Sequence, residues 1–389
     1  MKKLFMITTI LLAMLPVIYL LMPPVNVERY FSPAVVRIGS ESVPEHPIKN
    51  LFVGDMHADT LLWNRNIAEP SELGHADIQR LRDANVGLQV FMSVIEAPKD
   101  VESNSIEQEG DQITPIVVLD KWPIRSINSY KERALYQAGK LFKAEALSVG
   151  NLKVVLSRED LQQSEEWAAG KSPLYAILGL EGAHATEFER SNLLILFEAG
   201  YRTMELAHYS DTSFAGSSSG MVKYGLTDNG EKLVQDMNEL GMIIDVAHLA
   251  PKAIVDVLGV SSQPVFVSHT GIYSTCQKTR NLDDYLIQKI AQQNGIIGIG
   301  FFKEALCDNS IEALVEAIKY VRDLVGAKHV SLGSGWDIAP LVMSPRELPL
   351  LTQALLDVGF SQDEVRLVMG ENVRRFFLNN LPSKENESI

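Results

Sequence analysis

The sequence predicts an α/β fold, a (β/α)8 barrel of the TIM type, preceded by an N-terminal transmembrane helix. Eight short, nearly continuous apolar runs follow one another along the chain, as parallel strands covered on both faces require. Helical patterns fill the intervals between them, and polar side chains recur where the runs end. Eight strands alternating with helices over residues 50–380 fit a closed barrel better than an open doubly wound sheet.

The expected strands cover residues 51–59, 86–94, 175–184, 201–208, 241–249, 264–271, 295–302 and 329–337. Among the helices, Leu233, Val234, Met237 and Leu240 form one apolar stripe, which Gly241 ends. A second stripe covers residues 311–324 and ends at Gly326. Ser344 and Ser361 each begin a capping box, because a glutamate follows three residues later. These signals predict two further helices near the C-terminus.

The N-terminus predicts a membrane anchor. Lys2 and Lys3 precede an uncharged, mostly apolar run over residues 4–27, which is long enough to span a bilayer. The lysines favour a cytoplasmic N-terminus, and no small-residue cleavage site follows. We therefore expect residues 1–27 to be an uncleaved signal-anchor, with a long cleaved signal as the alternative. The following domain would then lie outside a bacterial inner membrane, in the periplasm.

The remaining boundaries follow from composition. Residues 28–49 read as a polar linker, residues 50–380 as the barrel domain and residues 381–389 as a polar tail. Acidic residues outnumber basic ones by 49 to 35, giving a formal charge of −14, which argues against nucleic acid as a partner. The two cysteines, Cys276 and Cys307, either form one disulfide or remain free thiols in the core.

Metal-binding side chain types gather at the strand ends, where barrels of this kind place their reacting groups. They are His57 and Asp59 after the first strand, Glu181 after the third, His208 after the fourth, His248 after the fifth and His269 after the sixth. Nitrogen and oxygen ligands without cysteine favour a borderline divalent metal such as zinc.

Six such groups exceed what one tetrahedral ion uses, so two ions sharing a carboxylate are expected. Glu181 is the natural bridge, since it ends an otherwise apolar strand where an unpaired charge would be costly. Asp55 precedes His57 by two residues, and we expect it to be a hydrogen-bond acceptor behind the ligands and not a ligand itself.

The chain resembles the membrane dipeptidase (renal dipeptidase) family of the amidohydrolase superfamily. The stretches that carry the resemblance are "DMHADT", "LEGAHA", "YRTMELAHYS", "LGMIIDVAHLA", "PVFVSHTGIYSTCQKTRN" and "MGENVRRFF", in family order from about residue 50 to 377. The resemblance implies a metal-dependent hydrolase barrel, a dipeptide substrate and two Zn²⁺ ions per chain. It also raises the expectation of a homodimer.

The same resemblance implies a role for each matching residue. His57 and Asp59 would bind one zinc ion, His248 and His269 the other, and Glu181 would bridge the two ions. His208 would contact the scissile carbonyl, and Arg280 would hold the terminal carboxylate of the dipeptide. The expected chemistry is metal-assisted hydrolysis of a peptide bond.

One family motif is altered. The family has a G-S-D-F-D-G motif at the eighth strand, whose first Asp carries a proton to the leaving amine, whereas this chain reads "GSGWDI" with Gly335 at that place. Three interpretations stay open: Asp337 substitutes for the missing acid, another group carries the proton and alters substrate choice, or the protein is a weakly active or inactive zinc-binding homologue that binds a peptide or partner. We expect an active enzyme. His184 and His329 are expected to be structural, and Trp336 lines the pocket or packs.

Overall fold

The structure, a computed structural model, describes residues 23–31, 45–98, 110–337 and 340–384. The strands of these residues are all parallel and form one sheet in the order β2-β1-β9-β8-β7-β6-β5-β4-β3. An additional pairing of β2 with β4 closes eight of them into a barrel. The strands are β1 (Val53–Ala58), β2 (Val86–Val94), β3 (Leu152–Val154), β4 (Leu174–Glu181), β5 (Tyr201–Glu205), β6 (Ile243–Asp245), β7 (Phe266–Thr270), β8 (Ile296–Ile299) and β9 (Val330–Leu332).

The predicted barrel is confirmed, since each of the eight expected ranges overlaps one barrel strand. The ninth strand, β3, was not predicted. It has only three residues and pairs with the first part of β4, outside the closed ring. Several observed strands end before the expected ranges do, because the residues at their carboxyl ends turn into the loops that carry the site.

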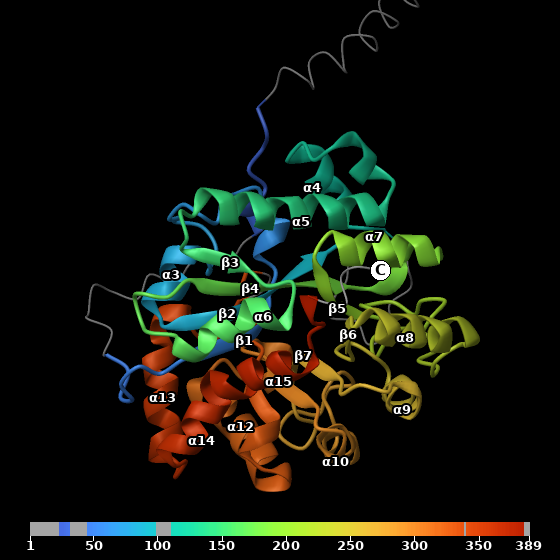
Figure 1. Ribbon diagram of the computed structural model, residues 1–389. Coiled ribbons are helices and arrows are strands. Elements are labelled where there is room, and N and C mark those ends of the chain that lie inside the picture. Colours follow the sequence, from blue (N-terminus) through green and yellow to red (C-terminus); the bar gives the residue numbers. More distant parts are fainter. Residues whose placement is uncertain (1–22, 32–44, 99–109, 338–339, 385–389) are drawn as a thin grey trace, which may run out of the picture.

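Helices surround the strands, as Figure 1 shows. They are α2 (Glu28–Phe31), α3 (Ile78–Asp83), α4 (Ile113–Leu119), α5 (Tyr130–Leu147), α6 (Arg158–Gln162), α7 (Arg190–Glu198), α8 (Asp228–Leu240), α9 (Pro251–Val260), α10 (Asp284–Gln292), α11 (Lys303–Leu306), α12 (Ile311–Val325), α13 (Leu348–Asp357), α14 (Gln362–Arg366) and α15 (Asn372–Asn380).

The predicted start and end signals of the helices are confirmed. Gly241 ends α8 with a left-handed φ of 72°, a conformation that glycine adopts without steric cost. Both capping boxes form: Ser361 begins α14, and Ser344 begins a short 3-10 turn over Pro345–Glu347 that leads into α13.

The C-terminal helix closes the amino-terminal end of the barrel. Phe376 and Phe377 of α15 pack against Phe266, together with apolar side chains that point into the barrel from β1, β2 and β4. Gly54 permits the close approach of the segment just before α15, because a Cβ there would lie 3.2 Å from the carbonyl oxygen of Gly370. With this end filled by apolar side chains, the polar groups of the interior are left at the carboxyl ends of the strands.

The last residue of the predicted anchor and the start of the predicted linker lie against the barrel. Val27 is buried beside Trp63 and Trp122, and Glu28 forms an ion pair of 2.7 Å with Arg65. The anchor prediction itself, residues 1–22 above all, lies outside the described residues. Among the residues that are described, no helix has the length and apolarity needed to cross a membrane.

Candidate metal centre

A first group of buried side chains meets at the carboxyl ends of β1 and β4. The Nε2 atom of His57 lies 3.2 Å from Oδ2 of Asp59 and 3.4 Å from Oε1 of Glu181. All three side chains are almost inaccessible to solvent. One nitrogen and two carboxylates pointing at one another form a possible ligand set for a divalent cation.

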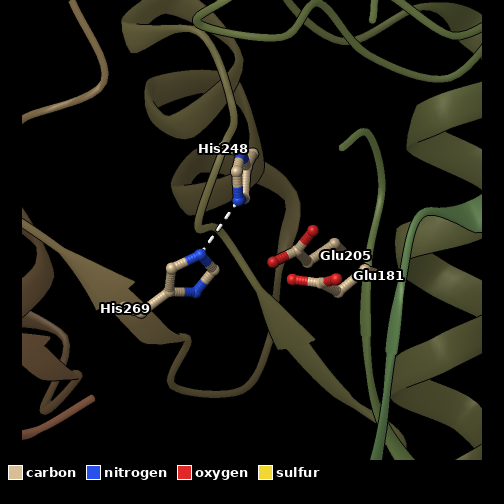
Figure 2. Close-up of side chains that lie close together, drawn as sticks. All are labelled: Glu181, Glu205, His248 and His269. Atoms are coloured by element: carbon tan, nitrogen blue, oxygen red, sulfur yellow. Dashed lines mark hydrogen bonds between the residues drawn. The ribbon is translucent and has the colours of Figure 1, made fainter. Parts of the chain in front are cut away.

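A second group shares Glu181 with the first. The ligand atoms of Glu181, Glu205, His248 and His269 all lie within 4.8 Å of one another. Figure 2 shows the two imidazoles turned toward each other, with the two carboxylates side by side next to them. The Nε2 atoms of His248 and His269 are 2.9 Å apart. Glu181 therefore stands between two potential cation sites, as the sequence predicted for a bridging ligand.

The loop after β6 holds His248 in an unusual backbone conformation. His248 has φ of 61°, and its carbonyl accepts a hydrogen bond of 2.7 Å from the backbone N–H of Ser218. A left-handed residue other than glycine is uncommon and is found mainly where the surroundings fix it. The ring of His269 is oriented by a contact of 2.9 Å between its Nδ1 atom and Oγ of Ser268.

Asp55 lies behind the ligands, as expected. Its carboxylate accepts hydrogen bonds from the backbone N–H of His57, from Gln89 and from Ser334. The β1–β2 register is irregular between Asp55 and Ala58, so the simple alternation of faces along a strand does not hold there. Burial raises the pKa of Asp55 to about 6, although these hydrogen bonds oppose the shift.

The pKa shifts of these buried side chains are those expected of a cation-binding site. Burial raises the pKa values of Glu181 and Glu205 well above the usual range, and repulsion from Asp59 and Asp245 adds to the shift. Burial lowers the pKa values of His248 and His269, which favours the neutral imidazoles that a metal ion can bind. Burial alone would also lower the pKa of His57, but Asp59 and Glu181 outweigh it and raise that pKa to about 9.

The hydrogen bonding of these buried acids also indicates a site for cations. Among the described residues, Oδ1 of Asp59 and both carboxylate oxygens of Glu205 are buried without a hydrogen-bond partner. Buried carboxylates normally have protein donors or a bound metal. The residues present therefore fit divalent cations.

Two further predicted residues lie beside these groups. Nε2 of His208 is 3.7 Å from Oε2 of Glu181, and burial lowers the pKa of His208 well below its usual value. Arg280 lies over the Phe302 ring at 5.0 Å, and one of its terminal nitrogens donates to the carbonyl of His269 at 3.3 Å. Within the part of the chain that the structure describes, the buried Nε–H of Arg280 has no hydrogen-bond partner, which leaves it available to an anionic group.

Residues 47–387 match the family model described as membrane dipeptidase (Peptidase family M19). The chain belongs to the membrane dipeptidase family. The resemblance seen in the sequence is thereby confirmed, as is its enzyme class, a hydrolase of the metallopeptidase type.

Relatives of known sequence and structure agree with this membership. A dipeptidase of Aspergillus oryzae, aclJ, is 28% identical over 89% of this chain and 82% of its own length, and a dipeptidase of Claviceps purpurea, tcpJ, is 28% identical over 78% and 68%. A metallopeptidase from Rhodobacter sphaeroides, solved with a phosphinate mimic of the dipeptide L-Ala-D-Ala, superposes with a TM-score of 0.71 at 21% identity, covering 86% of this chain and all of that one. The probable dipeptidase PvdM from Pseudomonas aeruginosa gives 0.70 at 18% identity, over 86% and 96%. These two likenesses show the fold.

In this dipeptidase-family barrel, Asp337 is not brought together with the metal-binding groups. Its carboxylate accepts hydrogen bonds from Thr60 at 2.6 Å, from Arg65, and from the backbone N–H groups of His75 and Ala76. Burial would raise the pKa of Asp337, but Arg65, His75 and Thr60 hold it well below its usual range. A carboxylate bound in this way is a poor proton donor, so the structure does not favour Asp337 as the substitute for the missing acid.

Gly335 and Trp336 contribute to the local structure through backbone conformation, backbone hydrogen bonds and packing. Gly335 has φ of 78°, and a Cβ there would lie 3.1 Å from the Phe302 ring, so the position favours glycine on both counts. Its N–H donates to the carbonyl of His57, and the carbonyl of Trp336 accepts from the N–H of Asp59. The Trp336 side chain is buried against Phe301 and packs in the core. This segment thus positions the ligand-bearing end of β1.

Sequence reasoning missed Glu205. It lies within "YRTMELAHYS", three positions before His208. A partial signal was present, because Glu205 is a single acid at the end of a buried strand, although Arg202 and Thr203 make that strand less apolar than the one that ends in Glu181. Such an acid can also be neutralised by a neighbouring base. Only the three-dimensional structure shows that the Glu205 carboxylate has no hydrogen-bond partner among the described residues and that Arg280 acts on it only as a nearby charge.

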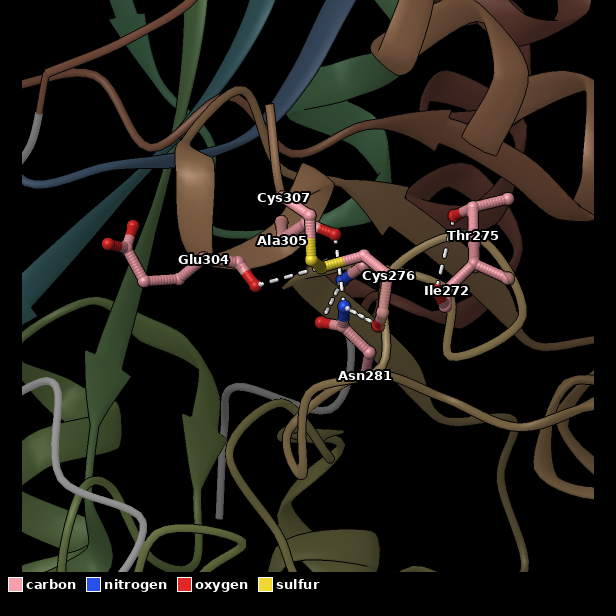
Figure 3. Close-up of a disulfide and its surroundings, with 8 residues drawn as sticks. Ile272, Thr275, Cys276, Asn281, Glu304, Ala305 and Cys307 are labelled. Atoms are coloured by element: carbon pink, nitrogen blue, oxygen red, sulfur yellow. Dashed lines mark hydrogen bonds between the residues drawn. A yellow bond between two sulfur atoms is a disulfide. The ribbon is translucent and has the colours of Figure 1, made fainter. Parts of the chain in front are cut away.

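The two cysteines form a disulfide, the pairing that the sequence left open. Figure 3 shows that it joins the loop after β7 to the end of α11, with a Cα–Cα distance of 5.4 Å. Asn281, the residue after Arg280, donates to the carbonyls of Cys276 and Ala305 and so ties the same two segments together. The loop that carries Arg280 is therefore fixed at two points.

The two histidines that were expected to be structural, His184 and His329, contact groups other than the metal-binding side chains. His184 lies 3.3 Å from a carboxylate oxygen of Glu96 and packs edge-on against Tyr130, while Nδ1 of His329 lies 2.9 Å from the carbonyl oxygen of Gly295. Both placements agree with the structural roles expected for them.

Proposed function

We propose that this protein is a membrane-anchored, two-zinc dipeptidase that hydrolyses the peptide bond of dipeptides. The observation that carries the proposal is the position of Glu181 between His57 and Asp59 on one side and His248 and His269 on the other. A carboxylate shared by two ligand sets is what two neighbouring cations require to offset their repulsion. Membership of the membrane dipeptidase family and the dipeptidase names of its relatives support the substrate class.

Bound zinc would supply a nucleophilic hydroxide at neutral pH and polarise the scissile carbonyl. His57 and Asp59 would hold one ion, His248 and His269 the other, and Glu181 both. His208 is neutral and lies next to Glu181, so its imidazole N–H is suited to donate to the carbonyl oxygen as negative charge develops there. Arg280 would bind the terminal carboxylate, because its buried Nε–H lacks a hydrogen-bond partner among the described ranges of the chain.

A second candidate function is a zinc-binding homologue that captures a peptide or a partner protein without turnover. The observation that favours it is the state of the segment after β9, where Gly335 offers no acid and Asp337 is bound to Arg65. Neither residue supplies the proton that the leaving amine needs. Binding of dipeptides to the zinc-loaded protein with no detectable release of amino acids would establish this second function.

The periplasmic location is part of the same proposal. It is supported by the apolar run after Lys2 and Lys3 and by the disulfide between Cys276 and Cys307. Disulfides persist in oxidising compartments and are rare in the cytosol. Accessibility of the barrel to an impermeant protease after removal of the outer membrane would test the location.

The decisive experiment is an assay of the full chain, purified with zinc, against a panel of dipeptides. Each dipeptide is compared with its C-terminal amide, which differs only in the group that Arg280 would bind. We expect hydrolysis of the free acids, with the amides poorer through a higher KM. Equal hydrolysis of acids and amides would contradict the role of Arg280, and no hydrolysis of either would contradict dipeptidase activity.

A further inference from the structure

Glu205 extends the second group of ligands beyond the residues that the family resemblance implies. It is the last residue of β5 and is directly paired in register with Asp245, the last residue of β6. Its side chain is fully buried. In Figure 2 its carboxylate lies beside that of Glu181 and next to the imidazoles of His248 and His269.

The neighbouring Asp245 differs from Glu205 because protein donors bind one of its oxygens, while its Oδ2 has no hydrogen-bond partner among the described residues. Oδ1 of Asp245 accepts hydrogen bonds of 3.0 Å from the backbone N–H groups of Ala247 and Ser268. Neither oxygen of Glu205 has a hydrogen-bond partner among the described residues. Leaving two buried acceptor atoms without donors is costly, so such an arrangement is expected only where a ligand completes it.

The geometry points to Glu205 as a fourth protein ligand of the cation held by Glu181, His248 and His269. This inference rests on the proposed function, because it presupposes that the centre binds two ions. The supporting observation is that one ligand atom from each of the four side chains lies within 4.8 Å of the others, with two nitrogens and two carboxylate oxygens in the set.

The consequence is an unequal pair of sites. His57, Asp59 and Glu181 give one ion three protein ligands, whereas the other ion receives four. Four protein ligands fill the tetrahedral shell that zinc prefers in structural sites, and three leave a position open, as in catalytic sites. We therefore expect the ion at His248 and His269 to be retained when the other is removed.

The test is stepwise removal of metal from the full chain. Zinc-loaded protein is titrated with a chelator while the zinc content per chain is measured by elemental analysis. Glu205→Gln keeps the size of the side chain and removes the charge, and Glu205→Met also removes the ligand oxygen. Asp245→Asn is the matched control, since it removes a buried negative charge one strand away while its amide oxygen can still accept from the backbone.

For the wild type we expect one ion to leave early and the second only at much higher chelator concentration. Outer-shell residues typically change metal affinity 10–100-fold, so loss of a direct ligand should weaken the second ion by about 100-fold or more. Both Glu205 variants should then lose their two ions nearly together, and Asp245→Asn should remain close to the wild type. Loading with Co²⁺ adds a spectroscopic check, because the visible absorption of the retained ion should change in the Glu205 variants.

Each other outcome overturns the inference in a distinguishable way. Unchanged release of both ions from Glu205→Gln and Glu205→Met would show that Glu205 is not a ligand, while the two-zinc proposal stands. Equal weakening in the Glu205 variants and in Asp245→Asn would show that Glu205 acts only through its charge. A wild type that binds no zinc would overturn this inference and the proposed function together.

Discussion

Two groups of buried acids in this barrel differ in what surrounds them. In the metal centre, Glu181 and Glu205 lie among imidazoles and other carboxylates, and both oxygens of Glu205 lack hydrogen-bond partners among the residues that the structure describes. Around Asp337, the carboxylate meets Arg65, the Thr60 hydroxyl and the backbone N–H groups of His75 and Ala76. The pKa values shift in opposite directions, raised for Glu181 and Glu205 and lowered for Asp337.

The comparison separates two uses of a buried carboxylate. The protein itself supplies every partner of Asp337, so this group stabilises the fold. In the metal centre, the ion-pair partners of the acids are imidazoles, so we expect these acids to act once a divalent cation binds. Replacing one acid in each group should therefore affect different properties, and the predictions below use that contrast.

The largest effect is expected for Glu181→Gln. The shared carboxylate is lost, and we expect kcat/KM for dipeptides to fall by roughly 10³-fold, within the range for removing one group at the reacting centre. The zinc content should drop as well, whereas the metal-free protein should unfold at the same or a higher denaturant concentration, since an uncompensated buried acid is removed. A variant with normal zinc content and turnover would show that Glu181 is not the bridge.

Asp337→Asn should show the reverse of Glu181→Gln, with lower stability and unchanged zinc binding. Breaking a buried ion pair typically costs several kcal/mol, and because Glu28 still faces Arg65, we expect a loss of about 3 kcal/mol in the free energy of unfolding. Denaturant titration measures this loss, and elemental analysis should show zinc unchanged. Loss of turnover at full stability would instead restore Asp337 as a candidate proton carrier.

Lowering the pH should remove the stabilisation that the ionised Asp337 carboxylate provides in the wild type. Its pKa is lower in the folded than in the unfolded chain, where an aspartate titrates near pH 4, so its stabilisation is present above about pH 4 and lost as the pH falls further. Between about pH 4 and pH 2, the unfolding midpoint of metal-free wild type should fall more steeply than that of Asp337→Asn. Parallel curves would mean that the ion pair contributes no pH-dependent stability.

The smallest effect is expected for Gly335→Asp, which adds the acid that the family motif leads one to expect. A non-glycine residue at φ of 78° costs about 1–2 kcal/mol, and the Phe302 ring lies close enough to add to this. We expect the variant to be less stable by that amount and the wild type to be active already. Turnover that appears only in the variant would support the zinc-binding homologue without activity.

The sequence was sufficient for the barrel and for the ligands that share its simplest pattern. Apolar runs ending in His57, Glu181, His248 and His269 predict both the strands and their common edge, because parallel strands bring their carboxyl ends together. The sequence was insufficient where the role of a side chain depends on contact partners from distant segments of the chain. Asp337 and Arg65 are separated by 272 positions, and neither gives a local signal that they pair. Glu205 had a local signal, but its lack of partners is visible only in the folded chain.

The contact between Glu28 and Arg65 bears on how this protein is prepared for experiments. A recombinant fragment that starts at Asn50, chosen to remove the predicted membrane segment, also lacks Val27 and Glu28. Such a fragment would expose Trp63 and Trp122 and leave Arg65 with one carboxylate in place of two. A fragment that starts at Pro23 keeps these contacts. The choice of the first residue therefore decides whether the isolated barrel is fully stable.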